Sequence, residues 1–149
     1  MVEMVVRRSP NPVMSPDGFP PLVWGPALWR VMHIMAFNYP LAPTRTHVTA
    51  YYQWFKSLCV MLPCRRCREE FCALVENPQS PLVLRKGTFT QRGIEGVGAA
   101  RHRVIKYTLD LHAAVNARLR KRFPTDARYW VRHYTRLRTR RAVPAVSKR

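Results

Sequence analysis

Two cysteines, Cys64 and Cys67, have the spacing of a redox dithiol, because two thiols three residues apart can close a disulfide across one helical turn. Pro63 precedes the pair and helix-forming residues follow it, so the sequence predicts that Cys64 lies at a helix N-terminus. Unpaired backbone N–H groups, the helix dipole and the three nearby arginines would stabilise a thiolate there, and the thiolate is the reactive form. Half of a zinc site and two inert core thiols are the alternatives on spacing alone.

The other two cysteines, Cys59 and Cys72, flank this pair. Cys59 lies in an apolar helical stripe, where a thiol is more often a small buried hydrophobe than a reactive group. We therefore interpret both as packing residues, and the favoured interpretation of the chain involves no metal. The alternative is that all four cysteines hold zinc or an iron–sulfur cluster in a basic module associated with nucleic acid.

The length of 149 residues predicts a single domain, and a hydrophobic fraction of 47% is typical of a folded chain. The net charge of +18 favours anionic partners. The basic C-terminal end has two interpretations: a solvated end that keeps the protein soluble, or a segment that binds anions weakly and without specificity. We find no secretory signal and no run of the roughly 20 apolar residues that cross a bilayer. A cytoplasmic location follows as an expectation, and there four cysteines suggest catalysis or metal binding rather than disulfide staples.

Helical periodicity and proline stops predict an all-α protein, built as a four-helix bundle with a short fifth helix. The four longer helices are expected at 24–39, 44–62, 64–76 and 100–121, with Pro26 in the first turn of the first helix. The fifth, short and basic, should follow a cap at Asp126.

The domain is expected to span 22–138 and to contain a long loop or insertion at 79–99, where glycines and prolines break any long element. A Pro-rich flexible arm at 1–21 precedes the domain. A basic, disordered tail at 139–149 follows it.

The helix faces carry polar and aromatic residues that a plain bundle does not need. Trp29 and His33 share one face because they are four residues apart, and His112 and Asn116 do the same on another helix. Taken alone, a buried aromatic and a satisfied core histidine would explain the first pair. A flat, partly polar cofactor between the helices, next to the dithiol, would account for all of these residues together.

Three blocks in this order resemble the Erv/ALR family of FAD-dependent sulfhydryl oxidases. The first runs from Trp24 to His33 and on to Tyr39-Pro40, similar to the family's W-x-x-x-H helix with its trailing Y-P. The second is the Pro-Cys-x-x-Cys around Cys64, and the third is the His-Ala-Ala-Val-Asn that starts at His112. The resemblance covers about 24–121, and three motifs in the right order on the right helices are a specific signal.

The resemblance implies that FAD is held between the helices, with the isoalloxazine against Cys67 and the adenine near His112. Trp130 is a candidate for a late family tryptophan. The cofactor-binding residues implied by the resemblance are Gly25, Trp29, His33, Tyr39, His112, Val115, Asn116, Leu119 and Lys121.

The implied reaction forms disulfides in protein substrates. A thiol-containing protein substrate or thioredoxin-like carrier would attack the Cys64–Cys67 disulfide at Cys64, the sulfur expected to be more accessible. The electron pair would pass to FAD and then to molecular oxygen, which leaves as hydrogen peroxide. The chain departs from the family at Tyr107 and Ala113, and it has no second CxxC to serve as a shuttle. Compact members without a shuttle are familiar from large cytoplasmic DNA viruses, so a host-cytoplasm or virion location is implied.

Apolar residues on the far sides of the first two helices predict a homodimer, since such helices need a second partner. The family resemblance implies the same pairing. The residues expected to form this surface are Trp24, Leu28, Met32, Met35, Tyr51, Tyr52 and Trp54.

Overall fold

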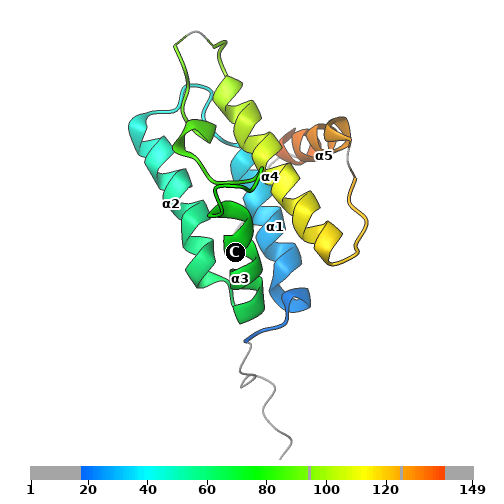
Figure 1. Cartoon of the computed structure of the whole chain (residues 1–149). Coiled ribbons are helices and arrows are strands. Elements are labelled where there is room, and N and C mark those ends of the chain that lie inside the picture. The colour runs from blue at the N-terminus through cyan, green and yellow to red at the C-terminus, as the bar shows by residue number, and fades with distance from the viewer. Residues whose placement is uncertain (1–17, 94, 125, 140–149) are drawn as a thin grey trace, which may run out of the picture.

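The structure, a computed structural model, describes residues 18–93, 95–124 and 126–139, in which helices are joined by loops (Figure 1). This part of the chain confirms the all-α prediction, and the observed helix ends lie within a few residues of those predicted. The elements are α1 (Pro21–Phe37), α2 (Arg45–Met61), α3 (Arg65–Val75), the short 3-10 helix η2 (Lys86–Thr88), α4 (Ala99–Arg118) and α5 (Ala127–Thr139).

The helix starts are set by local side-chain chemistry. Thr44 caps α2 through a reciprocal arrangement in which its hydroxyl accepts from the His47 N–H and the His47 ring accepts from the Thr44 N–H. Cys64 caps α3, with its Sγ accepting from the Cys67 N–H at 3.2 Å. One expectation needs correction: α1 begins at Pro21, so Pro26 lies inside the helix and not in its first turn.

Two helix pairs form the bundle: α1 packs against α4, and α2 packs against α3 (Figure 1). α5 lies beside the α1–α4 pair (Figure 1). The apolar faces of the four longer helices meet in one core, which includes Met32, Phe55, Phe71 and Leu111. Removing these side chains from water is the main contribution to stability in a bundle of this kind.

The described residues of the segment expected as a loop at 79–99 include no regular element but η2 before α4 begins at Ala99, yet the segment completes the core. Phe89 is fully buried, and its carbonyl accepts a hydrogen bond of 2.7 Å from the Tyr39 hydroxyl. The Tyr107 hydroxyl donates to the Leu82 carbonyl at 3.0 Å. The segment therefore ties α1 and α4 together from one side of the bundle.

The expected flexible arm overlaps the described residues only at 18–21, and there it is held in place. Gly18 forms an isolated antiparallel bridge with Cys64, and α1 begins three residues later. The rest of the arm and positions 140–149 of the expected basic tail lie outside the described residues. No helix in the described part of the chain is long and apolar enough to cross a membrane.

Of the seven residues expected to form the dimer surface, Met32 is buried and the other six are half-buried. Met32 is 1% exposed, and Trp24, Leu28 and the aromatic residues of α2 pack against the core. Large exposed apolar side chains of α1 are Leu22, Val23, Val31 and Ile34, and the last three lie one position before Trp24, Met32 and Met35. α1 therefore carries exposed apolar residues, Met32 is not one of them, and the homodimer itself stays a prediction.

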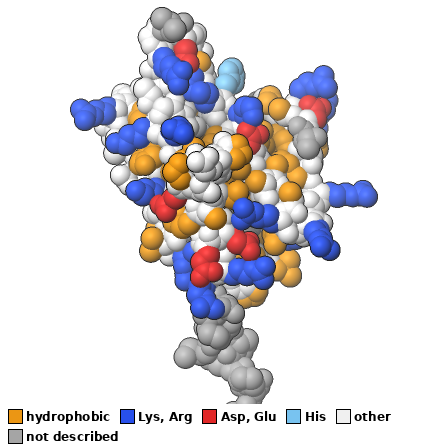
Figure 2. Space-filling model, viewed as in Figure 1, with side chains coloured by type: hydrophobic (Ala, Val, Ile, Leu, Met, Phe, Trp, Pro, Cys, Tyr) orange, Lys and Arg blue, Asp and Glu red, His pale blue; other side chains and the backbone are white. Residues whose placement is uncertain are grey.

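Basic side chains are spread over the visible face of the molecule, with few acidic side chains between them (Figure 2). Apolar patches lie among the basic groups on the same face (Figure 2). The net charge of +18 is therefore distributed over the folded part as well as the C-terminal end.

Candidate active site

Cys64 and Cys67 form a disulfide at the start of α3, with their Cα atoms 5.1 Å apart. The two cysteines have different surroundings: Cys67 is one of the residues that line a cavity, whereas Cys64 is not and is only 8% exposed. This corrects the expectation that Cys64 is the more accessible sulfur. The expectation failed because Gly18, which is distant in the sequence, pairs with the backbone of Cys64.

The arginines beside the disulfide are partly engaged elsewhere. Arg68 donates to the Leu62 carbonyl at 2.6 Å, and Arg66 forms an ion pair of 2.9 Å with Glu70. Of the effects expected to stabilise a thiolate, the structure retains the helix start, because Cys64 Sγ accepts a hydrogen bond from a first-turn N–H.

The cavity beside Cys67 has a volume of about 560 Å³, within the range of sites that hold small molecules and cofactors. α1, α3, α4 and α5 all contribute to its wall, together with Leu58 and Leu62 at the end of α2. Met32, Phe71 and Leu74 give it an apolar floor. A flat apolar body with polar ends fits such a site.

The structure brings most of the predicted cofactor residues to this one cavity. Tyr39 is a correction, because its ring is fully buried between Tyr51 and the Phe89 segment, away from the cavity lining. The predicted residues that do line the cavity are Gly25, Trp29, His33, His112, Val115, Asn116, Leu119 and Lys121.

Three aromatic rings form a layer in the wall. Trp29 stacks on His112 with ring centroids 4.0 Å apart and planes at 7°. His112 Nδ1 and His33 Nε2 share a hydrogen bond of 2.8 Å. Only one of two hydrogen-bonded ring nitrogens needs to carry a proton, so this contact suits two neutral rings.

Both histidines are held neutral at pH 7. Burial, reinforced by the nearby charge of His133, lowers the pKa of His33 to about 4. Burial, reinforced by His33, lowers the pKa of His112 to about 3. The layer therefore presents hydrogen-bonding groups and stacking surfaces without positive charge.

The residues present fit a cofactor of the FAD type. His33 Nδ1 is buried and lacks a hydrogen-bond partner within the described residues, which is what a site awaiting a polar ligand atom leaves behind. Arg30, Arg118 and Lys121 supply positive charge around the same cavity, as a diphosphate requires.

Arg120 adopts a left-handed conformation with φ of 53° at the end of α4, and Lys121 then donates its N–H back to the Asn116 carbonyl at 2.8 Å.

Sequence reasoning missed most of the contribution of α5. His133 and Tyr134 line the cavity together with Trp130, which stacks parallel to His33 with centroids 5.3 Å apart. The available signal was the four-residue spacing of Trp130 and Tyr134, which puts both rings on one face of a short basic helix.

Cys59 and Cys72 remain thiols, but they are neighbours. Their sulfurs and a carboxylate oxygen of Glu76 lie within 4.8 Å of one another, and Cys72 Sγ donates to the Cys59 carbonyl. Burial, with Cys72 and Glu76 adding to it, raises the pKa of the Cys59 thiol to about 12. A protonated thiol is a poor nucleophile, which fits the packing role. A site for metal that uses all four cysteines is not supported, because Cys64 and Cys67 bind each other.

The sequence model of the Erv1 / Alr family matches residues 26–135, most of the chain. The chain belongs to the Erv1 / Alr family. The match begins just inside α1 and ends within α5, so it includes every helix that lines the cavity.

Two relatives with similar sequences are viral proteins. A putative FAD-linked sulfhydryl oxidase of Invertebrate iridescent virus 6 is 28% identical over 68% of this chain and 83% of its own length. A probable FAD-linked sulfhydryl oxidase of Acanthamoeba polyphaga mimivirus is 31% identical over 69% of this chain and 59% of its own length. The crystal structure of the yeast Erv1 core superposes with a TM-score of 0.58 at 22% identity, covering 89% of this chain and 96% of that one, which supports the fold.

The neutral histidine layer predicts that acid destabilises the protein. Because the folded-state pKa values of His33 and His112 lie below the unfolded value of 6.5, the unfolded chain binds more protons between pH 6.5 and about 4. The free energy of unfolding should therefore be fully present above pH 6.5 and fall as the pH drops, by at most about 1.4 kcal/mol per pH unit for each histidine. Urea unfolding of the full chain at a series of pH values measures this slope.

His33→Gln should reduce that slope, because it removes one of the two buried imidazoles. His102→Gln, which changes an exposed ring on α4, is the matched control and should keep the wild-type slope. Equal slopes in wild type and His33→Gln would contradict the neutral pair.

Proposed function

We propose that this chain is an FAD-dependent sulfhydryl oxidase that forms disulfides in protein substrates with release of hydrogen peroxide. The observation that carries the proposal is that the disulfide reaches the cavity through one sulfur only: Cys67 lines the wall that also contains Trp29, His33 and His112. The names of the viral relatives support the same activity.

In this proposal the chain's own residues divide the work. Cys64 receives the substrate thiolate, and Cys67 leaves as the thiolate that faces the cavity. Trp29 and His112 offer a flat stacking surface, while His33 Nδ1 offers a hydrogen bond from a neutral ring. Lys121 contributes positive charge for phosphate groups at the rim. The apolar floor limits water beside the sulfur.

The overall reaction converts two substrate thiols and one molecule of oxygen into one disulfide and one molecule of hydrogen peroxide. When bound, FAD supplies a two-electron acceptor that molecular oxygen regenerates. The chain supplies a reactive disulfide and a site that orients the acceptor against Cys67.

The proposed partners are a thiol-containing protein or thioredoxin-like carrier and molecular oxygen. Because the named relatives belong to viruses, the proposed location is the host cytoplasm or the virion. Weak binding of anions by the basic C-terminal end is proposed from its charge alone.

Substituting the cysteines should separate catalytic from packing thiols. Cys64→Ser and Cys67→Ser each remove one sulfur of the only disulfide in the described chain, so each should reduce dithiothreitol-dependent oxygen uptake by at least about a hundredfold. Cys59→Ser is the matched control, because its thiol is protonated and should not take part. Oxygen-electrode measurements on flavin-loaded full chain give the rates.

Wild-type oxygen uptake in Cys67→Ser would contradict the proposal outright. Loss of turnover in Cys59→Ser, with the fold and the flavin content retained, would show instead that a second redox pair operates beside the first.

Cofactor retention tests the proposed binding residues. Trp29→Ala and His112→Ala each remove half of the stacked pair, so the purified variants should lose most of their visible flavin absorbance while keeping their helical circular dichroism. Tyr39→Phe alters a ring outside the cavity and should retain flavin. Full flavin content in both alanine variants would exclude the cavity as the cofactor site.

A homodimer is the proposed working unit, built on the outward face of α1. Val23, Ala27, Val31 and Ile34 recur at four- and three-residue intervals, and all four are exposed. Val60 and Met61 add exposed apolar surface where α2 ends. An apolar stripe of this kind on a protein of high net charge is typical of an interface.

Val31→Glu should weaken this contact, because it places a charge at the middle of the stripe. Sedimentation equilibrium of flavin-loaded protein should then shift from dimer to monomer mass, while Val97→Glu, at an exposed loop position, should leave the mass unchanged. A monomer mass for the wild type at micromolar concentration would overturn the proposal.

A further inference from the structure

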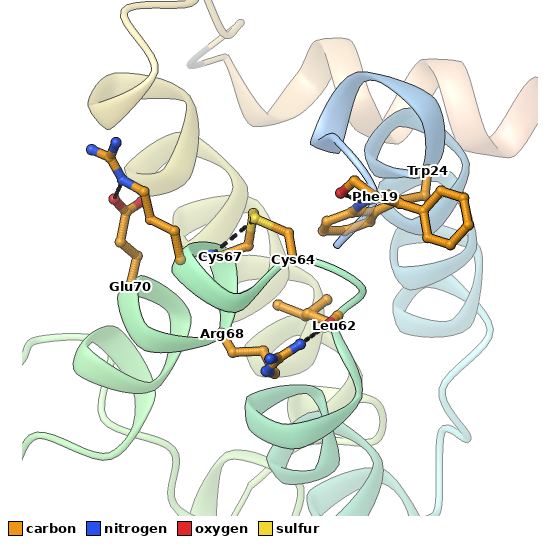
Figure 3. Close-up of a disulfide and its surroundings, with 8 residues drawn as sticks. Phe19, Trp24, Leu62, Cys64, Cys67, Arg68 and Glu70 are labelled. Atoms are coloured by element: carbon orange, nitrogen blue, oxygen red, sulfur yellow. Dashed lines mark hydrogen bonds and ion pairs between the residues drawn. A yellow bond between two sulfur atoms is a disulfide. The ribbon is translucent and has the colours of Figure 1, made fainter. Parts of the chain in front are cut away.

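The backbone edge at Pro63 and Cys64 is paired with the protein's own chain. Gly18 and Cys64 form an antiparallel bridge, and the Phe19 N–H donates to the Pro63 carbonyl at 2.8 Å. We call Gly18 and Phe19 the strap. The Phe19 carbonyl in turn accepts from Trp24 Nε1 at 3.0 Å, which ties the strap to α1. Figure 3 shows Phe19 and Trp24 on the Cys64 side of the disulfide.

The strap requires glycine at position 18. Gly18 has φ of +85°, a conformation that L side chains rarely adopt. A Cβ at this position would lie 2.0 Å from the Pro63 carbonyl oxygen, which is backbone and cannot move aside like a flexible side chain. The close approach of the two backbones is therefore a specific feature of this sequence.

The strap lies against the backbone of the cysteine that the proposed reaction needs from outside. Cys67 faces the cavity, so a substrate thiol must reach Cys64, yet Cys64 is only 8% exposed. Pro63 itself is exposed, and its carbonyl is the acceptor that the strap occupies. Without the strap this edge would be open, and an open edge is a template for another extended chain.

We propose that the Pro63–Cys64 edge is the docking surface for the backbone of an extended, thiol-bearing polypeptide, and that the strap holds this edge until such a substrate replaces it. The inference rests on the proposed oxidase function. It names the substrate class, since a polypeptide brings the backbone N–H that the Pro63 carbonyl requires and dithiothreitol does not. The strap makes the backbone hydrogen bond to the Pro63 carbonyl that the substrate would make.

Docking at this edge places the substrate thiolate beside Cys64. Its attack forms a bond between the substrate sulfur and Cys64 Sγ, breaks the Cys64–Cys67 bond and leaves Cys67 as a thiolate that carries the electron pair. A second substrate thiolate then attacks the substrate sulfur of the mixed disulfide. Cys64 leaves as a thiolate, and the substrate departs oxidised. The two thiol protons go to solvent.

Two variants of the full chain release the strap in different ways. Gly18→Val adds a side chain that collides with the Pro63 carbonyl, and Phe19→Pro removes the N–H donor. Gly96→Ala is the matched control, because a Cβ there meets nothing within 4 Å. After reduction, alkylation of Cys64 by iodoacetamide, followed by mass spectrometry, reports exposure of this sulfur whether or not flavin is bound.

Cys64 alkylation should rise by roughly two- to tenfold in both strap variants, the factor expected from losing one backbone hydrogen bond, and should not change in Gly96→Ala. The kcat/KM for a synthetic dithiol peptide should rise by a similar factor. The same peptide with N-methylated backbone amides around its cysteines cannot donate a hydrogen bond to the Pro63 carbonyl. Its kcat/KM should therefore rise less in the strap variants than that of the plain peptide.

Unchanged alkylation and unchanged peptide turnover in both strap variants would overturn the inference. An equal rise in kcat/KM for the plain and the N-methylated peptide in the strap variants would overturn docking by backbone pairing. If wild-type, flavin-loaded chain fails to oxidise dithiothreitol, the proposed function fails, and the alkylation rates alone still decide whether the strap covers Cys64.

Discussion

The turn from Pro63 into α3 is the constraint on which the rest of the site depends. Cys64 ends the extended segment and caps the helix, and Cys67 lies one turn further on. A disulfide fixed in this position has one sulfur on the wall of the cavity and the other on the outer side. Electrons can therefore enter from one side and leave on the other without movement of the helices, which is why the bundle around the turn can be rigid.

The cavity that Cys67 lines also has neutral rings in its wall. Burial holds His33 and His112 uncharged, and their mutual hydrogen bond fixes the ring orientations against Trp29. Positive charge is kept at the rim, on side chains such as Arg30 and Lys121. An apolar body with an anionic end is the ligand that this separation of charge favours.

The helices were predictable because their signals are local: apolar periodicity, proline stops and capping residues act within a few positions. Eight of the nine cofactor residues that the family resemblance implied line one cavity. Helical spacing by itself predicted only that Trp29 and His33 share one face and that His112 and Asn116 share another. Two of the failures are contacts between distant segments. No residue near Tyr39 in the sequence indicates that its hydroxyl donates a hydrogen bond to the Phe89 carbonyl. No residue near Cys64 indicates that Gly18 pairs with its backbone.

The most direct test of the central claim is anaerobic reduction of the bound flavin by a dithiol. Dithiothreitol, added without oxygen to flavin-loaded full chain, should bleach the flavin absorbance with one dithiol oxidised per flavin, after the disulfide pair has first been reduced. Cys67→Ser with flavin bound should resist bleaching, because the sulfur that lines the cavity is missing. Bleaching of Cys67→Ser at the wild-type rate, or no bleaching of the flavin-loaded wild type, would contradict transfer of electrons through this disulfide.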